Sequence, residues 1–211
     1  MRAYWRAVIL LWNSYRKSGT FGRLHIAIRF LTCPFLRILP HVPLNAGRLL
    51  EIGGGHGVFA HLAADRGVSA VVVDPDLRKI FSVGRRSAVS FVGAFDDCVV
   101  GKFEAIAILD VLYAIPIAEW DAILGRIHTR LTPGGVLLLK EMDPSSWKQR
   151  WNQFQEAVSQ RFLGITLAAT FNYEPREALV GRLLRNGFSR VEVVKVDRGY
   201  PHPHLLYLGW K

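Results

Sequence analysis

Short apolar runs alternate with stretches of helical periodicity along most of this chain. From residue 48 onwards, runs that are apolar at successive positions are each followed by a segment whose apolar residues recur every three or four positions. Continuous apolar runs are typical of strands buried on both faces, as in a parallel sheet. The alternation therefore predicts an α/β domain in which helices cover both faces of a largely parallel sheet.

Seven strands are predicted from these runs. They are Arg48–Ile52, Ala70–Val73, Val89–Val92, Phe103–Leu109, Val136–Lys140, Val191–Val196 and Leu205–Leu208. Helices are expected at about 57–66, 76–83, 117–131 and 175–186. The last two strands flank the turn 197–203 and predict an antiparallel hairpin at the edge of the sheet.

Residues 1–41 precede the alternating part and are predicted to form a helical cap, with residues 42–211 as the main domain. Ser18-Gly19-Thr20 interrupts the helical pattern, and Thr20 is a candidate N-cap of a second helix, Phe21–Leu31. Cys33-Pro34 ends that helix. A further short turn leads to the boundary near His41.

The first helix, residues 1–17, is predicted to be amphipathic. On a helical wheel its apolar arc holds Tyr4, Trp5, Val8, Leu11, Trp12 and Tyr15, and the opposite side holds Arg2, Arg6, Asn13, Arg16 and Lys17. A basic helix with aromatic residues on its apolar side is typical of one lying in the plane of a membrane surface. The same arc also suits packing against the domain over its active site, and both interpretations stay open.

A glycine-rich turn follows the first strand. Residues 51–57 read Glu-Ile-Gly-Gly-Gly-His-Gly. Glycine permits positive φ and lets a ligand lie against the backbone, and the helix that follows offers free N–H groups to an anionic group such as a carboxylate. The dinucleotide pattern G-x-G-x-x-G fails, because the sixth position from Gly53 is Val58. A phosphate-binding Gly-Lys-Ser/Thr is absent as well.

This acidic-x-G-x-G-x-G turn resembles the first motif of class I S-adenosylmethionine (SAM)-dependent methyltransferases. Phe103–Tyr113, Leu131–Leu137 with its Pro-Gly-Gly turn, and the closing hairpin are similar to further motifs of that family. The resemblance spans residues 48–211. It implies a Rossmann-like seven-stranded sheet of order 3-2-1-4-5-7-6 with an antiparallel last strand, and S-adenosyl-L-methionine as the cofactor.

The resemblance also implies which residues bind the cofactor. Asp74 ends the strand after the glycine turn, where a carboxylate accepts hydrogen bonds from both ribose hydroxyls. The family often places an acid after strand three to contact adenine, whereas here Ala94-Phe95 occupy that place, with Asp96 next. The predicted cofactor-binding residues are Glu51, Gly53, Gly54, Gly55, Gly57, Asp74, Pro75, Ala94, Phe95 and Asp110.

Methyl transfer is an in-line displacement, so the protein aligns the acceptor and needs a base only where the nucleophile loses a proton. Candidates beyond the carboxyl ends of the strands are Asp110, Tyr113, Glu141, Asp143, His202 and His204. Of these we predict Glu141, at the end of strand five, His202, in the closing turn, and Tyr113 as catalytic residues. No metal site is predicted, because Cys33 and Cys98 form no CxxC pair.

The net charge of +10 is concentrated at the N-terminus. Residues 1–50 contain 8 of the 27 basic residues and none of the 17 acidic ones, so the remaining 161 residues are nearly neutral. Residues 144–173 carry aromatic side chains with basic ones among them. This segment is predicted to form a lid over an apolar pocket, lined by Trp147, Trp151, Phe154 and Tyr173.

These observations predict a SAM-dependent methyltransferase that acts on a small, hydrophobic or lipid-like acceptor near an anionic membrane surface. Residues 30–35 and Trp147-Lys148 resemble small bacterial methyltransferases found with lipid or polyene biosynthesis genes. Without a signal peptide or a span of about 20 apolar residues, the protein is expected in the cytoplasm, peripheral on the inner membrane face.

Three alternatives have other activities. An RNA methyltransferase would use the basic N-terminal segment to hold phosphates, but no Asn/Asp-Pro-Pro-Tyr/Phe motif follows strand four, and nucleic acid is not the expected partner. Aminopropyl transfer, as in spermidine synthases, would need an acidic cluster there. A non-catalytic SAM-binding subunit would have an acceptor pocket without polar side chains.

Overall fold

The computed structural model of the chain describes residues 2–16, 18–76, 79, 88–92, 101–143, 172–200 and 203–211. Several predictions fall on residues outside these ranges. They are the helix expected after Asp76, the adenine contacts at Ala94, Phe95 and Asp96, the candidate base His202, and the lid segment 144–173 except for Asn172 and Tyr173.

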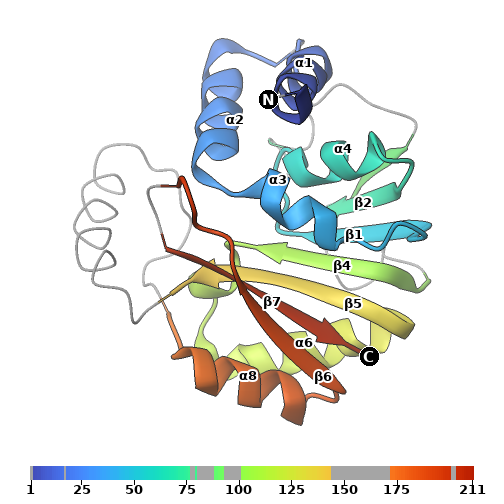
Figure 1. Ribbon diagram of the computed structural model, residues 1–211, viewed down its shortest axis with the longest axis vertical. Coiled ribbons are helices and arrows are strands. Elements are labelled where there is room, and N and C mark those ends of the chain that lie inside the picture. The colour runs from blue at the N-terminus through green and yellow to red at the C-terminus, as the bar shows by residue number, and fades with distance from the viewer. Residues whose placement is uncertain are drawn as a thin grey trace.

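Seven strands form one sheet (Figure 1). They are β1 (Arg48–Ile52), β2 (Ser69–Val73), β3 (Val89–Val92), β4 (Phe103–Leu109), β5 (Leu131–Met142), β6 (Arg190–Lys195) and β7 (His204–Trp210). Their order is β3-β2-β1-β4-β5-β7-β6. β1 to β5 pair in parallel, and β7 is antiparallel to both β5 and β6. The predicted fold class and strand order are confirmed.

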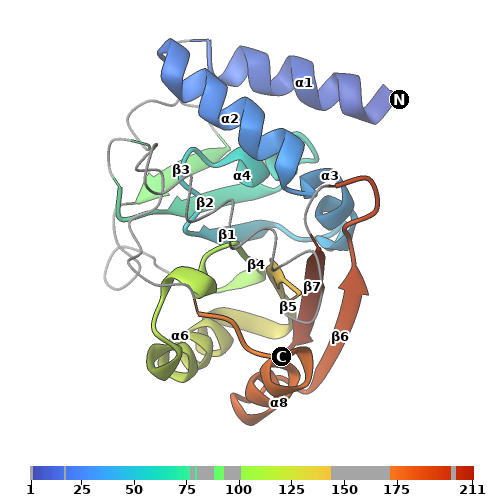
Figure 2. The same ribbon diagram turned by 90° about the vertical axis from the view of Figure 1, so that its left-hand side faces the viewer.

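Helices cover both faces of the sheet (Figures 1 and 2). On one side lie α1 (Arg2–Ser14), α2 (Thr20–Thr32), α3 (Phe35–Ile38) and α4 (Val58–Ala64). On the other side lie α6 (Ile117–Arg130) and α8 (Arg176–Arg185). Short 3-10 turns occur at Leu39–His41 and Leu112–Ala114. None of the described helices is long and apolar enough to cross a bilayer.

Side chains alternate along each strand and so divide the core into two layers. Leu49 of β1 is buried in the same cluster as Phe59 of α4, on the side of the N-terminal helices. Its neighbour Leu50 is buried with Trp120 of α6 and Leu179 of α8 on the opposite side. Because both faces of the central strands are covered, most of their positions are apolar on both sides, as the parallel-sheet prediction required.

Two local predictions are wrong. The N-cap of α2 is Gly19, and no side chain caps this helix, so Thr20 lies inside the first turn. β5 already begins at Leu131 and contains the predicted turn, because Leu131 pairs with Phe103 before the register shifts and resumes with Val136 opposite Ala105. The strand also continues past Lys140 to Met142, which places Glu141 within it.

The predicted apolar arc of the first helix is divided between two sides. Tyr15 and Leu11 are buried, together with Leu10, which lay outside that arc. Trp5 and Trp12, by contrast, are 61% and 65% exposed. The helix therefore packs on the domain along a face centred on Leu10 and Leu11, and turns its tryptophans outward.

Trp120 is buried in the core layer between the sheet and the helices α6 and α8, and its replacement tests how much this layer stabilises the fold. Trp120 is 1% exposed, and its Nε1 donates a hydrogen bond to the Ile115 carbonyl at 2.9 Å. We expect Trp120→Ala to lower the free energy of unfolding by about 3–5 kcal/mol, because it leaves a large cavity. Urea denaturation measures this loss. Leu184→Ala, at a half-exposed position on α8, serves as a control and should change stability by less than about 0.5 kcal/mol.

Candidate active site

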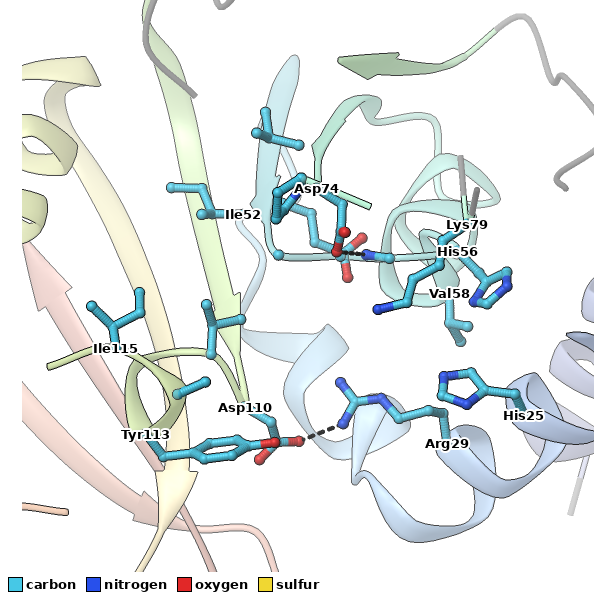
Figure 3. A pocket seen from close by; sticks show the side chains of 18 of the residues that line it. His25, Arg29, Ile52, His56, Val58, Asp74, Lys79, Asp110, Tyr113 and Ile115 are labelled. Atoms are coloured by element: carbon cyan, nitrogen blue, oxygen red, sulfur yellow. Dashed lines mark hydrogen bonds and ion pairs between the residues drawn. The ribbon is translucent and has the colours of Figure 1, made fainter. Parts of the chain in front are cut away.

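A cavity of about 750 Å³ opens at the carboxyl ends of β1, β2 and β4 (Figure 3). The turn after β1 and Asp74 after β2 form one part of its wall, and Asp110 and Tyr113 after β4 form another. α2 closes it from the opposite side with His25, Ile26 and Arg29. Small-molecule sites have volumes of about 300–1,000 Å³, so the cavity is large enough for a nucleoside-sized ligand.

The glycine turn is shaped by close approaches of other residues. Gly53 has φ +66°, and a Cβ there would lie 2.5 Å from a methyl group of Val111. At Gly54 a Cβ would lie 2.7 Å from the Glu51 side chain and 2.8 Å from that of Val72. Larger residues at these two positions would displace the loop after β4 or the β1–β2 core. The motif therefore maintains the packing of the turn as well as bare backbone for a ligand.

Glu51 holds the turn against the next helix. Its side chain is buried, and Oε2 accepts a hydrogen bond from the backbone N–H of Ala60 in α4 at 2.9 Å. Burial raises the pKa of Glu51 to about 8, although the Ala60 hydrogen bond acts in the opposite direction. The carboxyl is therefore largely neutral at pH 7, and it lines the cavity.

Asp74 lies beside the glycine turn, as the sequence predicted. Its Oδ2 accepts a hydrogen bond from the Gly55 N–H and its Oδ1 one from the Asp76 N–H, both at 2.8 Å. These bonds fix the carboxylate at the cavity wall (Figure 3). Each carboxylate oxygen accepts more than one hydrogen bond, so both remain able to accept ligand hydroxyls. Pro75 lines the cavity next to it.

Asp110 is the centre of a partly buried ion cluster. It has φ +60°, and its carboxylate accepts hydrogen bonds from Nη1 of Arg29, at 2.9 Å, and from Nζ of Lys140. Burial alone would raise the pKa of Asp110, but the cations Lys140 and Arg29 outweigh this effect and hold its pKa well below the usual range. Arg29 also donates to the Leu109 carbonyl at 3.3 Å, so α2 is joined to the end of β4.

The residues proposed for catalysis differ in their relation to the cavity. Tyr113 lines it, and its ring stacks on that of Tyr173 with centroids 6.1 Å apart. Glu141 is buried and is not among the lining residues. Its Oε1 accepts a hydrogen bond from the Leu112 N–H at 2.9 Å, next to Tyr113. Nε2 of His204 lies 3.0 Å from the carbonyl oxygen of Thr32, so His204 contacts the end of α2.

Arg29 and the histidine pair, His25 of α2 and His56 of the glycine turn, were missed as site residues. The two imidazole rings lie 5.3 Å apart, and both histidines line the cavity. Burial lowers the pKa of both imidazoles. The nearby positive charge of Arg29 lowers the pKa of His25 further, and the pKa of His56 falls to about 4. Both rings are neutral at pH 7. Only their position inside the basic N-terminal segment and the glycine motif hinted at a role.

The architecture and this site match one family. Its description is "Methyltransferase domain", and it matches residues 24–193. The chain belongs to this methyltransferase family. The match begins within α2 and ends in β6, so it includes the glycine turn, Asp74, Asp110 and the helix that closes the cavity.

Individual relatives agree with the family. Demethylspheroidene O-methyltransferase of Rhodobacter capsulatus is 31% identical over 101 residues, which cover 46% of this chain and 26% of that protein. Human N-acetylserotonin methyltransferase in complex with SAM superposes with a TM-score of 0.69 at 16% identity, over 90% of this chain and 55% of that one. A SAM-dependent methyltransferase from Archaeoglobus fulgidus superposes with a TM-score of 0.67 at 14% identity, over 97% of this chain and 99% of that one.

The family match confirms the predicted methyltransferase class of this domain. The two solved structures are less than 25% identical, so they bear on the fold alone. The chain spans about a quarter of the length of its curated relative. The activity of the complete protein, and its acceptor, are therefore matters for proposal.

Buried neutral carboxyls make the methyltransferase domain sensitive to pH. Burial raises the pKa of Glu141 from 4.5 to about 8, with nearby Asp110 adding to the effect. Between these values the folded state keeps a proton that the unfolded state releases, so stability falls as pH rises, by up to about 1.4 kcal/mol per pH unit for each such group. Glu51 contributes in the same direction.

Glu141→Gln removes one of these titrating groups and leaves an oxygen that accepts the Leu112 N–H. We expect the free energy of unfolding of this variant to fall less steeply from pH 5 to pH 8 than that of the wild type. Urea denaturation at pH 5, 6.5 and 8 measures both slopes. Parallel pH profiles for the two proteins would show that Glu141 is ionised in the folded state.

Proposed function

We propose that this protein transfers the methyl group of SAM to a hydroxyl oxygen of a small, apolar acceptor taken up near a membrane surface. The observation that carries the proposal is that one and the same cavity is lined by the glycine turn, Asp74 and Tyr113. O-methylation is supported by the name of the R. capsulatus relative, a demethylspheroidene O-methyltransferase. The apolar residues Ile26, Phe35 and Ile115 in the cavity wall favour an apolar acceptor.

In this proposal Asp74 accepts hydrogen bonds from the ribose hydroxyls of SAM. The backbone of residues 53–57 and the guanidinium of Arg29 hold the amino-acid end, because N–H groups and a cation complement its carboxylate. Asp110 keeps Arg29 in place and offers a negative charge to the amino group. Glu51 and Pro75 line the same cofactor-binding part of the cavity. Ala94 and Phe95 remain predictions for the adenine contact.

SAM, when bound, supplies an electrophilic methyl group, so the protein binds and aligns the acceptor and receives its proton. Tyr113 donates or accepts a hydrogen bond at the acceptor hydroxyl. His25 lines the same cavity as Tyr113, and its lowered pKa leaves the imidazole neutral at pH 7, so in this proposal it accepts the proton that the hydroxyl releases. Glu141 acts as a positioning residue through Leu112, and His202 remains a candidate outside the described residues.

Residues 1–41 act as a cap in this proposal, since α2 closes the cavity.

An RNA substrate is the weaker alternative. Arg29 is turned inward toward Asp110, and Arg23 donates to the backbone carbonyls of Ser18 and Arg16. These two arginines are thus engaged within the protein rather than arrayed for phosphates. A non-catalytic subunit is disfavoured by the polar groups of Tyr113, His25 and His56 in the cavity.

Asp74→Asn tests the cofactor assignment. Replacing the carboxylate by an amide removes charge-assisted hydrogen bonds worth about 1.5–3 kcal/mol. We therefore expect the Kd for S-adenosylhomocysteine, measured by calorimetry, to rise about 10- to 100-fold. Asp121→Asn is the matched control, because Asp121 lies on α6 and pairs with Arg182. An unchanged Kd in Asp74→Asn would remove this residue from the cofactor site.

Tyr113→Phe tests the acceptor side. The variant keeps the ring that stacks on Tyr173 and loses only the hydroxyl, so we expect kcat to fall by about 10- to 100-fold, at or below the usual contribution of acid–base groups, while the Kd for S-adenosylhomocysteine stays the same. Transfer of radiolabelled methyl from SAM to apolar phenols and alcohols in mixed micelles measures kcat. Equal kcat values in both proteins would exclude the Tyr113 hydroxyl from catalysis.

A further inference from the structure

Exposed apolar side chains gather on the N-terminal helices. In the described part of the chain, seven of the nine large apolar residues that are exposed belong to α1 and α2. The seven are Tyr4, Trp5, Ile9, Trp12, Leu24, Ile28 and Leu31. Trp5, Ile9 and Trp12 follow the spacing i, i+4, i+7, and Leu24, Ile28 and Leu31 repeat it, so each helix carries one exposed apolar stripe.

The two stripes lie on the outer side of one helical pair. α1 and α2 are antiparallel neighbours, since the ring of Tyr4 lies 5.6 Å from that of Phe30 and the Arg23 guanidinium 5.9 Å from the Trp12 ring. Both helices lie outside α4, at the end of the molecule (Figures 1 and 2). Leu10 and Ile26, on the opposite sides of their helices, are buried. We name the six residues Trp5, Ile9, Trp12, Leu24, Ile28 and Leu31 the α1–α2 face.

The net charge on and beside the two helices is positive. Arg2 and Arg16 are exposed there, while Arg6 pairs with Asp65 and Arg23 donates to backbone carbonyls. Residues 1–50 themselves contain no Asp or Glu. Tryptophan and arginine around an aliphatic stripe suit the interface of an anionic bilayer, where the rings enter the headgroup layer and the cations meet the phosphates. A second copy of the chain would bring the same arginines against these and be repelled.

We propose that the α1–α2 face docks on an anionic phospholipid bilayer, with both helices lying in the plane of its surface. This deepens the membrane location in the proposed function and is independent of the methyl transfer itself. The opposite side of α2 carries His25, Ile26 and Arg29 into the cavity. Docking therefore holds the cavity about one helix diameter, about 10 Å, from the lipid surface, where an apolar acceptor would be concentrated.

Vesicle flotation of the full chain tests the docking. The vesicles contain either 30% phosphatidylglycerol in phosphatidylcholine or phosphatidylcholine alone, at low and high salt. We expect the chain to float with the anionic vesicles and to be released by high salt. I28Q/L31Q, which disrupts only the α2 stripe, should weaken the partition coefficient about tenfold or more, because two partly buried aliphatic contacts are lost. L44Q/L184Q changes two exposed apolar residues elsewhere and should float like the wild type.

Three outcomes would overturn the docking proposal. The first is that I28Q/L31Q floats as well as the wild type. The second is that the wild type binds neutral vesicles as well as anionic ones, or binds neither. The third is that sedimentation shows the face joining two copies of the chain. Calorimetry with S-adenosylhomocysteine on each variant, without vesicles, shows whether its cofactor site is folded. Loss of flotation with cofactor binding intact concerns the face alone, whereas flotation without cofactor binding contradicts only the proposed function.

Discussion

The ion cluster at Asp110 is the interaction on which the site depends. A largely buried carboxylate at the end of β4 is costly unless cations neutralise it, and here Lys140 of β5 and Arg29 of α2 do so. Lys140 belongs to the sheet, but Arg29 comes from the N-terminal helices. The need to neutralise one buried charge thus ties the cap to the carboxyl ends of the strands, where the cavity forms.

Two other carboxyls near Asp110 have a raised pKa, whereas the pKa of Asp110 is lowered. Glu51 and Glu141 are buried, but each accepts a backbone N–H, and among the described residues neither carboxylate forms an ion pair like that of Asp110. Desolvation then dominates and raises the pKa of both to about 8. The distribution of cations, and not burial as such, decides that Asp110 is charged at the cavity wall while the other two carboxyls hold the backbone of the flanking turns.

α2 presents different residues to the cavity and to the surface, because the side chains of a helix point to different sides. His25 and Arg29 face the cavity, and Leu24 and Ile28 face outward. The surface proposed to bind lipid and the cavity wall proposed to contact cofactor or acceptor are therefore separated by a single helix. This arrangement relates the basic composition of the first 50 residues to the chemistry of the domain without requiring nucleic acid as a partner.

Sequence alone determined the strands, their order through the family resemblance, and the glycine turn with Asp74, because apolar runs, glycine spacing and strand ends are local or nearly local features. Its errors also have local causes. The wheel of residues 1–17 grouped Trp12 with Leu11, although only packing against α4 decides which side of an amphipathic helix is buried. Tertiary structure alone decided that Arg29 meets Asp110, 81 positions away, and that Glu141 faces the Leu112 backbone. Such pairings depend on how helices and strands pack, and no periodicity in the chain encodes them.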